Sequence, residues 1–250
     1  MFLYLIKNGE KISLTAQTDF ELVGLSGMAP GEATINTTAI ATSDGSIFDS
    51  ARANERQLVL TFIPTNSIET TRLTLAGYFP RKAAVELEIK TDTRTVRAAG
   101  YVKAIAYDTF TKTQRVQVTV ICPSAYFFAA SPVSYTLGAE VEITNAGDVS
   151  IGGIFDMTAT GAVDTITFSL DNGQELIVNA AAANGDKIVI DTRTGHLSVT
   201  KNGVNILHLV DIINSDWIKF PEGLSVLTMT TTGTGSLSGS VSIRPMYEGV

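Results

Sequence analysis

Apolar and polar residues alternate along most of this chain, which is the pattern of β-strands with one buried face. In the segment ERQLVLTFI, for example, Leu58, Leu60 and Phe62 lie two positions apart. The same alternation predicts strands in KAAVELEIK, AAGYVKAIAYD, TQRVQVTVIC, VDTITFSLD, QELIVNA, GDKIVIDT, HLSVTKNG, LSVLTMTT and GSVSIRP. Asn-Gly and related pairs, which favour chain reversal, separate several of these segments. The pattern therefore predicts an all-β protein.

One segment, TNSIETTRLTLAGYFP, departs from this alternation. Its apolar residues recur at roughly helical spacing, Asn66 stands three residues before Glu69 as in a capping arrangement, and Pro80 ends the run. The sequence thus predicts one helix over about 67–79. It also indicates a second, shorter helical turn around VDIINSDW.

The 250 residues suit two domains better than one. Pro123 and Pro132 flank an aromatic cluster, and proline interrupts strand pairing there. The charge changes at the same place: residues 1–125 hold 13 basic and 12 acidic residues, net +1, whereas residues 126–250 hold 5 and 13, net −8. We therefore expect a β-sandwich over 1–125 and a second β-sandwich over 126–250.

The polar segment between the first strands and residue 57 is the most unusual part of the chain. Residues 29–56 are poor in bulky apolar groups, and Asp44 with Gly45 gives a reversal signal near the middle. A segment of this kind buries little of its own surface. From the residues alone, it is either a solvated hairpin loop or an arm that orders against a neighbouring subunit.

Few residues in the chain are suited to catalysis or to metal binding. The GxSxG nucleophile motif and the GxxxxGK[ST] phosphate loop are absent, and GDVSIGG is expected to be a turn at a strand edge. A single cysteine, Cys122, excludes an intramolecular disulfide. Two histidines, His196 and His208, stand at no metal-ligand spacing. We predict neither an enzyme, nor a metal site, nor a cofactor.

The many carboxylates of the second half mostly stand beside glycine or asparagine, so we expect them to serve in turns. The net charge of −7 disfavours a nucleic-acid partner, and no segment reaches the roughly 18 apolar residues of a membrane span.

The order and spacing of several strings resemble one known family, the siphophage distal tail proteins, often called Dit. In the first half these strings are LSGMAP, DGSIFDSARANERQLVLTF, IETTRLTLAGYFPRK and TRTVRAAGYVKAIAYDTFTKTQRVQVTVICPSAYFF. In the second half they are NAGDVSIGGIFDMTATG, NGQELIVNAAAANGDKIVIDTRTG, INSDWIKFPEGLSVLTM and YEGV. The resemblance covers nearly the whole chain.

This resemblance implies a structural protein of a phage or prophage tail. It implies six subunits in a ring at the distal end of a non-contractile tail, located in the virion after synthesis in the host bacterial cytoplasm. The expected partners are the tail tube protein, the tail hub protein and receptor-binding or baseplate proteins. The expected second domain is a galectin-like or carbohydrate-module-like jelly roll.

Under the same resemblance, residues 29–56 are an assembly arm that links neighbouring subunits. We then expect Asp44 and Gly45 near its turn, and Phe48, Arg52 and Arg56 in the oligomer interface. The alternative from another class is a carbohydrate-binding protein in which Trp217, the only tryptophan, stacks on a sugar. A single tryptophan between apolar neighbours is more often a core residue.

Overall fold

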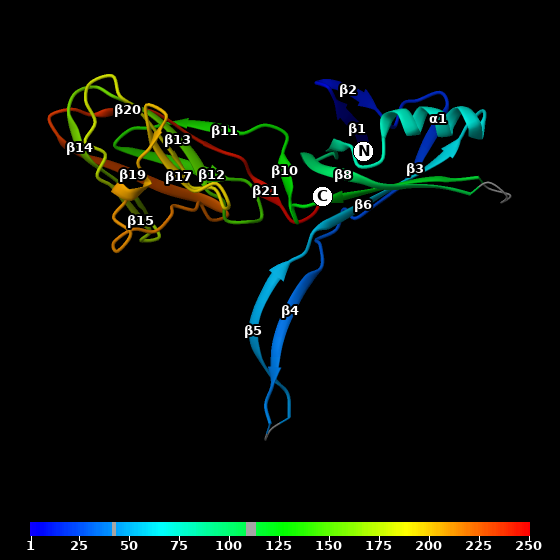
Figure 1. Cartoon of the computed structure of the whole chain (residues 1–250), viewed down its shortest axis with the longest axis horizontal. Helices are drawn as coiled ribbons and strands as arrows, with labels where there is room; N and C mark the ends of the chain where they lie inside the picture. Colours follow the sequence, from blue (N-terminus) through cyan, green and yellow to red (C-terminus); the bar gives the residue numbers. More distant parts are fainter. Residues whose placement is uncertain (42–43, 109–113) are drawn as a thin grey trace. The chain divides into compact units, whose positions relative to one another are not determined.

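The computed structural model describes residues 1–41, 44–108 and 114–250, and these residues form two compact units. Unit 1 comprises residues 1–130 and 247–250, and unit 2 comprises residues 131–246. The division falls five residues after the boundary expected from the sequence, and residues 247–250 return to unit 1. Figure 1 labels most of the elements along the chain.

The elements of unit 1 are mostly antiparallel strands. They are β1 (Phe2–Lys7), β2 (Glu10–Ser13), β3 (Phe20–Ser26), β4 (Ala33–Ala39), β5 (Ser46–Ala53), β6 (Arg56–Pro64), α1 (Ile68–Tyr78), β7 (Ala84–Lys90), β8 (Thr95–Tyr107), β9 (Val116–Cys122) and β10 (Phe127–Ala129). Seven of them follow the order β2-β1-β7-β8-β9-β6-β3 in one sheet, and β10 pairs with β8. The alternating residues of β6 and β9 bury one face of this sheet.

Helix α1 covers part of that buried face. Leu75 of the helix and Phe79, which follows it, are fully buried in the same cluster as Leu60 and Phe62 of β6. The helix begins and ends within one residue of the predicted bounds. The expected Asn66 capping arrangement is wrong, because Ser67 occupies the N-cap and makes no side-chain cap bond.

Unit 2 is a sandwich of two antiparallel sheets. Its elements are β11 (Val133–Thr136), β12 (Glu140–Asn145), β13 (Gly153–Ala159), β14 (Val163–Leu170), β15 (Glu175–Val178), β16 (Lys187–Asp191), β17 (Ser198–Lys201), β18 (Val204–Asn205), the 3-10 helix η1 (Leu207–Leu209), β19 (Gly223–Gly233) and β20 (Leu237–Ile243), with β21 (Met246–Tyr247) at the boundary. The sheet orders are β11-β20-β13-β16-β17-β18 and β12-β19-β14-β15.

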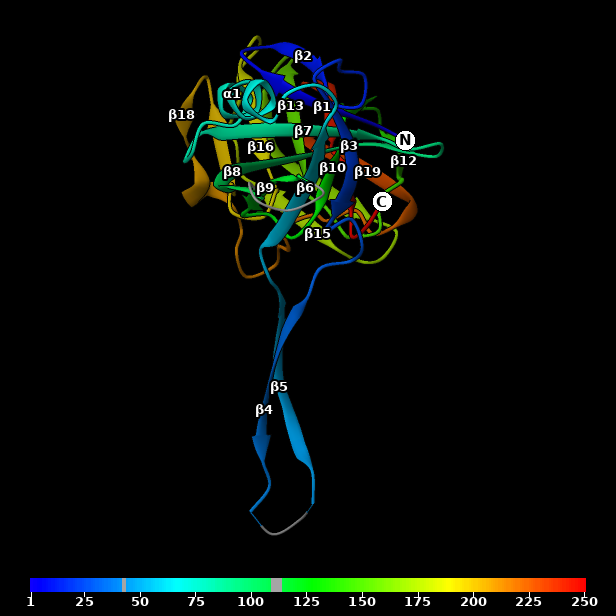
Figure 2. The same ribbon diagram turned by 90° about the vertical axis from the view of Figure 1, so that its right-hand side faces the viewer.

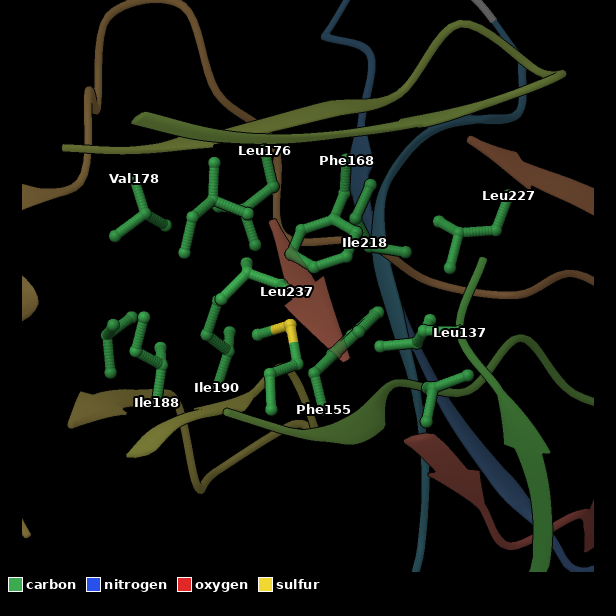
Figure 3. Close-up of a cluster of buried hydrophobic side chains, with 14 of the residues drawn as sticks. Leu137, Phe155, Phe168, Leu176, Val178, Ile188, Ile190, Ile218, Leu227 and Leu237 are labelled. Atoms are coloured by element: carbon green, nitrogen blue, oxygen red, sulfur yellow. The ribbon is translucent and has the colours of Figure 1, made fainter. Parts of the chain in front are cut away.

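The two sheets of unit 2 enclose one apolar core. Figure 3 shows Phe155 from one sheet and Phe168 from the other pointing toward each other, and their ring centroids lie 4.6 Å apart. The short helical turn lies at 207–209, whereas the sequence placed it at VDIINSDW, residues 210–217, which contain no helix. The predicted all-β fold with one α-helix is confirmed.

Candidate assembly interface

The predicted arm is a two-stranded antiparallel hairpin that belongs to none of the three larger sheets. Strands β4 and β5 pair with each other alone among the described strands, and Figures 1 and 2 both show them as a long ribbon. Their register pairs Ala33 with Ala53 at one end and Ala39 with Ser46 at the other. Between Asn36 and Thr37 the register shifts by one residue, so that Asp49 forms a β-bulge. We call β4 and β5 with their connection the arm.

One face of the arm is mostly polar, although Ile47, which pairs with Thr38, is 58% exposed on it, and several of its polar side chains bond to one another across the strands. The Asn36 amide donates to the Ser50 hydroxyl at 2.9 Å, and the Thr38 hydroxyl donates to the Asp49 carboxylate at 2.6 Å. Nearer the body of unit 1, the Thr34 hydroxyl donates to the Asn54 side-chain oxygen at 2.7 Å. These bonds support the register of the hairpin.

The opposite face of the arm is apolar. Because side chains alternate along each strand, the register places Ile35 beside Ala51 and Phe48 beside Thr37, with the Ala33–Ala53 pair on the same face. Ile35 is 63% exposed and Phe48 is 62% exposed. A lone two-stranded hairpin is marginally stable in water. Burial of bulky apolar side chains away from water lowers the free energy. This face, which we call the apolar arm face, is therefore suited to bind a partner surface.

The base of the arm is anchored by Arg56, at the start of β6. Its side chain donates to the main-chain carbonyls of Gly27 and Ala29 at 2.5 and 2.7 Å, and twice to that of Ala125 at 3.1 and 2.8 Å. It also donates to the carbonyl of Glu248. Burial lowers the pKa of Arg56 from its ordinary value.

The Arg56 guanidinium also lies 4.2 Å from the centroid of the Phe127 ring. Arg56 therefore joins both segments at the arm's base to the strand that follows residue 125. At the same place Gly27 has φ +90°, and a β-carbon there would lie 2.0 Å from the Gln57 carbonyl oxygen, so only glycine fits.

The structure separates the five residues that the sequence placed in the interface. Asp44 and Gly45 lie in the bend just before β5, as expected for the turn. Phe48 lies on the apolar arm face and Arg52 on the polar one. The expectation for Arg56 needs correction: it is 3% exposed and bonded within its own chain, so it anchors the arm and presents no surface.

Sequence reasoning missed Ile35 and the division of the arm into two faces. The alternation of Ala33, Ile35 and Thr37 was a signal for the apolar arm face in β4. In β5 the bulge at Asp49 shifts the alternation by one residue, so that Phe48 and Ala51 share a face although they stand three positions apart.

Trp217, the residue of the carbohydrate-binding alternative, and the two histidines lie in unit 2. Trp217 is partly buried and packs against the core of unit 2, which agrees with the core interpretation. His196 lies in a turn and His208 in η1. In the ranges that the structure describes, no group of three or more His, Cys, Asp or Glu side chains is arranged to hold a metal ion.

Several carboxylates of unit 2 close turns, as the sequence predicted. Asp186 accepts from the main-chain N–H of Ala183 at 2.8 Å, and this bond, with one from the Asn202 amide, lowers its pKa. The Asn214 amide donates to Asp211 at 2.9 Å and lowers the pKa of that carboxyl in the same way. No helix among the described residues is long and apolar enough to cross a membrane.

Comparisons with known proteins agree with this architecture. Residues 146–244 match the family described as siphovirus-type tail component, C-terminal domain. The crystal structure of the Dit protein of phage SPP1, described as a paradigm of the hub adsorption apparatus in phages that infect Gram-positive bacteria, matches at a TM-score of 0.75 and 16% identity over 98% of each chain. No curated protein sequence matches the chain.

A second solved structure, the phage P2 baseplate in its activated conformation with calcium, matches at a TM-score of 0.49 and 10% identity, covering 100% of this chain and 99% of that one. That similarity is too low to support an argument. The family match and the fold of the SPP1 protein confirm the resemblance to siphophage distal tail proteins that the sequence indicated.

Proposed function

We propose that this Dit-like tail protein is a non-enzymatic scaffold that forms a hexameric ring at the distal end of a non-contractile phage tail. In this proposal the ring joins the tail tube to the tail hub, and unit 2 offers surfaces to receptor-binding or other baseplate proteins. The protein is then a component of the virion.

The observation that carries the proposal is the arm. A two-stranded hairpin whose bulky apolar side chains stay in water gains stability when a partner covers them. When that partner is the next copy of the same chain, each subunit gives one contact and receives one. Repetition of such a head-to-tail contact at the correct rotation closes a ring.

The charges of the two units support the same assignment. Unit 1 holds 13 basic and 13 acidic residues, net 0, whereas unit 2 holds 5 and 12, net −7. Copies of unit 1 therefore meet without net repulsion, whereas copies of unit 2 repel one another at close range. The zero net charge of unit 1 is compatible with a lumen that lets DNA pass.

The test removes the arm and keeps its base. Ala33 and Ala53 face each other in the register, so a two-residue Asn-Gly turn can replace residues 34–52. The full chain is expected to form particles of about 160 kDa, six copies of 26.6 kDa, by light scattering. The shortened chain should remain folded by circular dichroism and stay monomeric.

Normal rings from the shortened chain would contradict the role of the arm. A full chain that stays monomeric at all concentrations, and also fails to join tail-tube or hub proteins, would contradict the proposal as a whole.

A further inference from the structure

The solvent-facing side of the sheet in unit 1 contains an apolar recess. Its volume is about 550 Å³, and its walls include Ile6 of β1, Ala84 of β7, Ala99 and Tyr101 of β8 and Phe128 of β10. Ala84 and Ala99 are exposed, and Tyr101 is 54% exposed at the rim. Because two of the wall residues are alanines, the sheet surface is open to a bulky group from outside. The volume falls in the range of about 300–1,000 Å³ that suits a bound ligand.

The charged groups beside this recess are paired with one another. Glu88 is buried under Lys11 and Arg97, bonds to Lys11, and accepts from the Arg97 Nε at 3.1 Å. Arg97 also reaches Glu86, a wall residue, at 3.4 Å. A partner that binds in the recess therefore does not need a charged group to neutralise these residues, and an apolar side chain suits the recess best.

We propose that the apolar arm face of one copy docks into this recess on a second copy, an inference that rests on the assembly role proposed above. Phe48 and Ile35 supply the bulky apolar groups that the recess lacks, and Tyr101 offers an aromatic edge to the Phe48 ring. Donor and acceptor both belong to unit 1, whose net charge is zero. The contact is head to tail, since the arm and the recess are different surfaces of the chain, and it therefore extends from copy to copy.

Disulfide trapping tests which face of the arm meets the recess. The variant Ala51→Cys/Ala99→Cys carries one thiol on the apolar arm face and one in the recess, and it leaves Ile35 and Phe48 in place. Its control is Ser50→Cys/Ala99→Cys, because Ser50 is the neighbouring residue on the polar face. The native Cys122 is buried and does not compete.

After oxidation, the Ala51→Cys pair is expected to give a ladder of linked chains on a non-reducing gel, and the Ser50→Cys control is expected to give little. Rings that form normally but link through neither pair, or through both equally, would overturn the proposal. Trapping with Ala84→Cys in place of Ala99→Cys should reproduce the result, since both residues line the recess.

Filling the recess gives an independent measurement. Ala99→Arg places a large charged group where Phe48 would lie, and it should weaken ring assembly at least about 30-fold in sedimentation, as expected for the loss of a central apolar contact. The control is Ala106→Arg, at an exposed position of the same strand outside the recess. It should assemble like the unmodified chain.

The two proposals fail in different ways. Shortening the arm could abolish rings while Ala99→Arg assembles like Ala106→Arg and the Ala51→Cys pair links no better than the Ser50→Cys pair. In that case the arm links copies at another surface, and only the recess proposal is overturned. If the full chain never assembles, both proposals fall.

Discussion

The core of unit 2 and the arm of unit 1 are built from the same alternation of apolar and polar residues, yet they differ in what covers the apolar face. In unit 2, Phe155 and Phe168 come from facing sheets, and each covers the other. In the arm, Phe48 lies on a single two-stranded layer and is 62% exposed. Alternation determines which face of a strand is apolar, whereas burial depends on a second layer, which the arm does not have among the described residues.

The largest expected effect separates these two phenylalanines. Phe168→Ala should lower the free energy of unfolding of unit 2 by about 3–5 kcal/mol, because it leaves a cavity between the sheets. Phe48→Ala should change the stability of the monomer by no more than about 0.5 kcal/mol, since the side chain contacts mainly water. Urea unfolding followed by Trp217 fluorescence reports on unit 2, because Trp217 packs against that core.

The measurement must be made where the chain is monomeric, since assembly would add stability to the arm. A large loss of stability for Phe48→Ala under those conditions would mean that the arm folds back on its own chain. It would contradict the contrast between an exposed Phe48 and a buried Phe168.

The next effect contrasts the two arginines at either end of residues 52–56. Arg56→Met should lower the stability of unit 1 by about 2–4 kcal/mol, because it removes several part-buried charged hydrogen bonds to the carbonyls of Gly27, Ala29 and Ala125. Arg52→Met, at an exposed position on the arm, should stay within about 0.5 kcal/mol. Chemical unfolding followed by circular dichroism measures both variants. Equal effects would show that the base of the arm is not held by Arg56.

The same contrast explains how much could be predicted from sequence. The helix and the strands were predictable because their signals are local: apolar spacing, a proline stop and turn pairs. The position of the arm was predictable because a long polar run stands between strands. The role of Arg56 was not, because its acceptors come from three segments, at residues 27–29, at 125 and at 248, and no local pattern records that they meet.

The recess could not be predicted from the sequence for a related reason. Its walls come from β1, β7, β8 and β10 and from the residues that follow β1 and β9, and two of the wall residues are alanines that form no distinctive pattern in their own strands. Likewise, a one-residue bulge at Asp49 decides which residues share a face of β5, and no spacing rule predicts it.

A smaller effect concerns the buried carboxylate beside the recess. Burial alone would raise the pKa of Glu88, but hydrogen bonds and charges from Lys11 and Arg97 outweigh it and lower that pKa below the ordinary value of 4.5. A carboxyl with a lowered pKa in the folded state contributes stability above its unfolded pKa, and this contribution is lost as the pH falls through the folded pKa.

Glu88→Gln should therefore lower the stability of unit 1 by about 2 kcal/mol at pH 7, the range expected for hydrogen bonds to a charged group. The difference from the unmodified chain should shrink as the pH falls below 4.5. The control is Glu69→Gln, whose carboxylate pairs with Arg72 on the surface of α1 and should contribute less than about 1 kcal/mol. Thermal unfolding between pH 3 and pH 7 measures both, and a pH-independent difference for Glu88→Gln would contradict this account.

The smallest expected effect on the fold comes from a comparison of the reaction rates of two thiols. Cys122 is buried at the end of β9, and burial raises its pKa to about 11, against a smaller opposing effect of Arg56. Since the thiolate is the reactive form, ionisation alone should slow its reaction with a disulfide reagent at pH 8 by about 100-fold relative to an ordinary thiol. A thiol placed on the apolar arm face by Ala51→Cys should react at the ordinary rate in the monomer and more slowly in the ring. If Ala51→Cys reacts equally fast in both states, the arm is not covered on assembly. If Cys122 reacts as fast as that thiol, the sheet beneath the recess opens readily and cannot serve as a rigid acceptor.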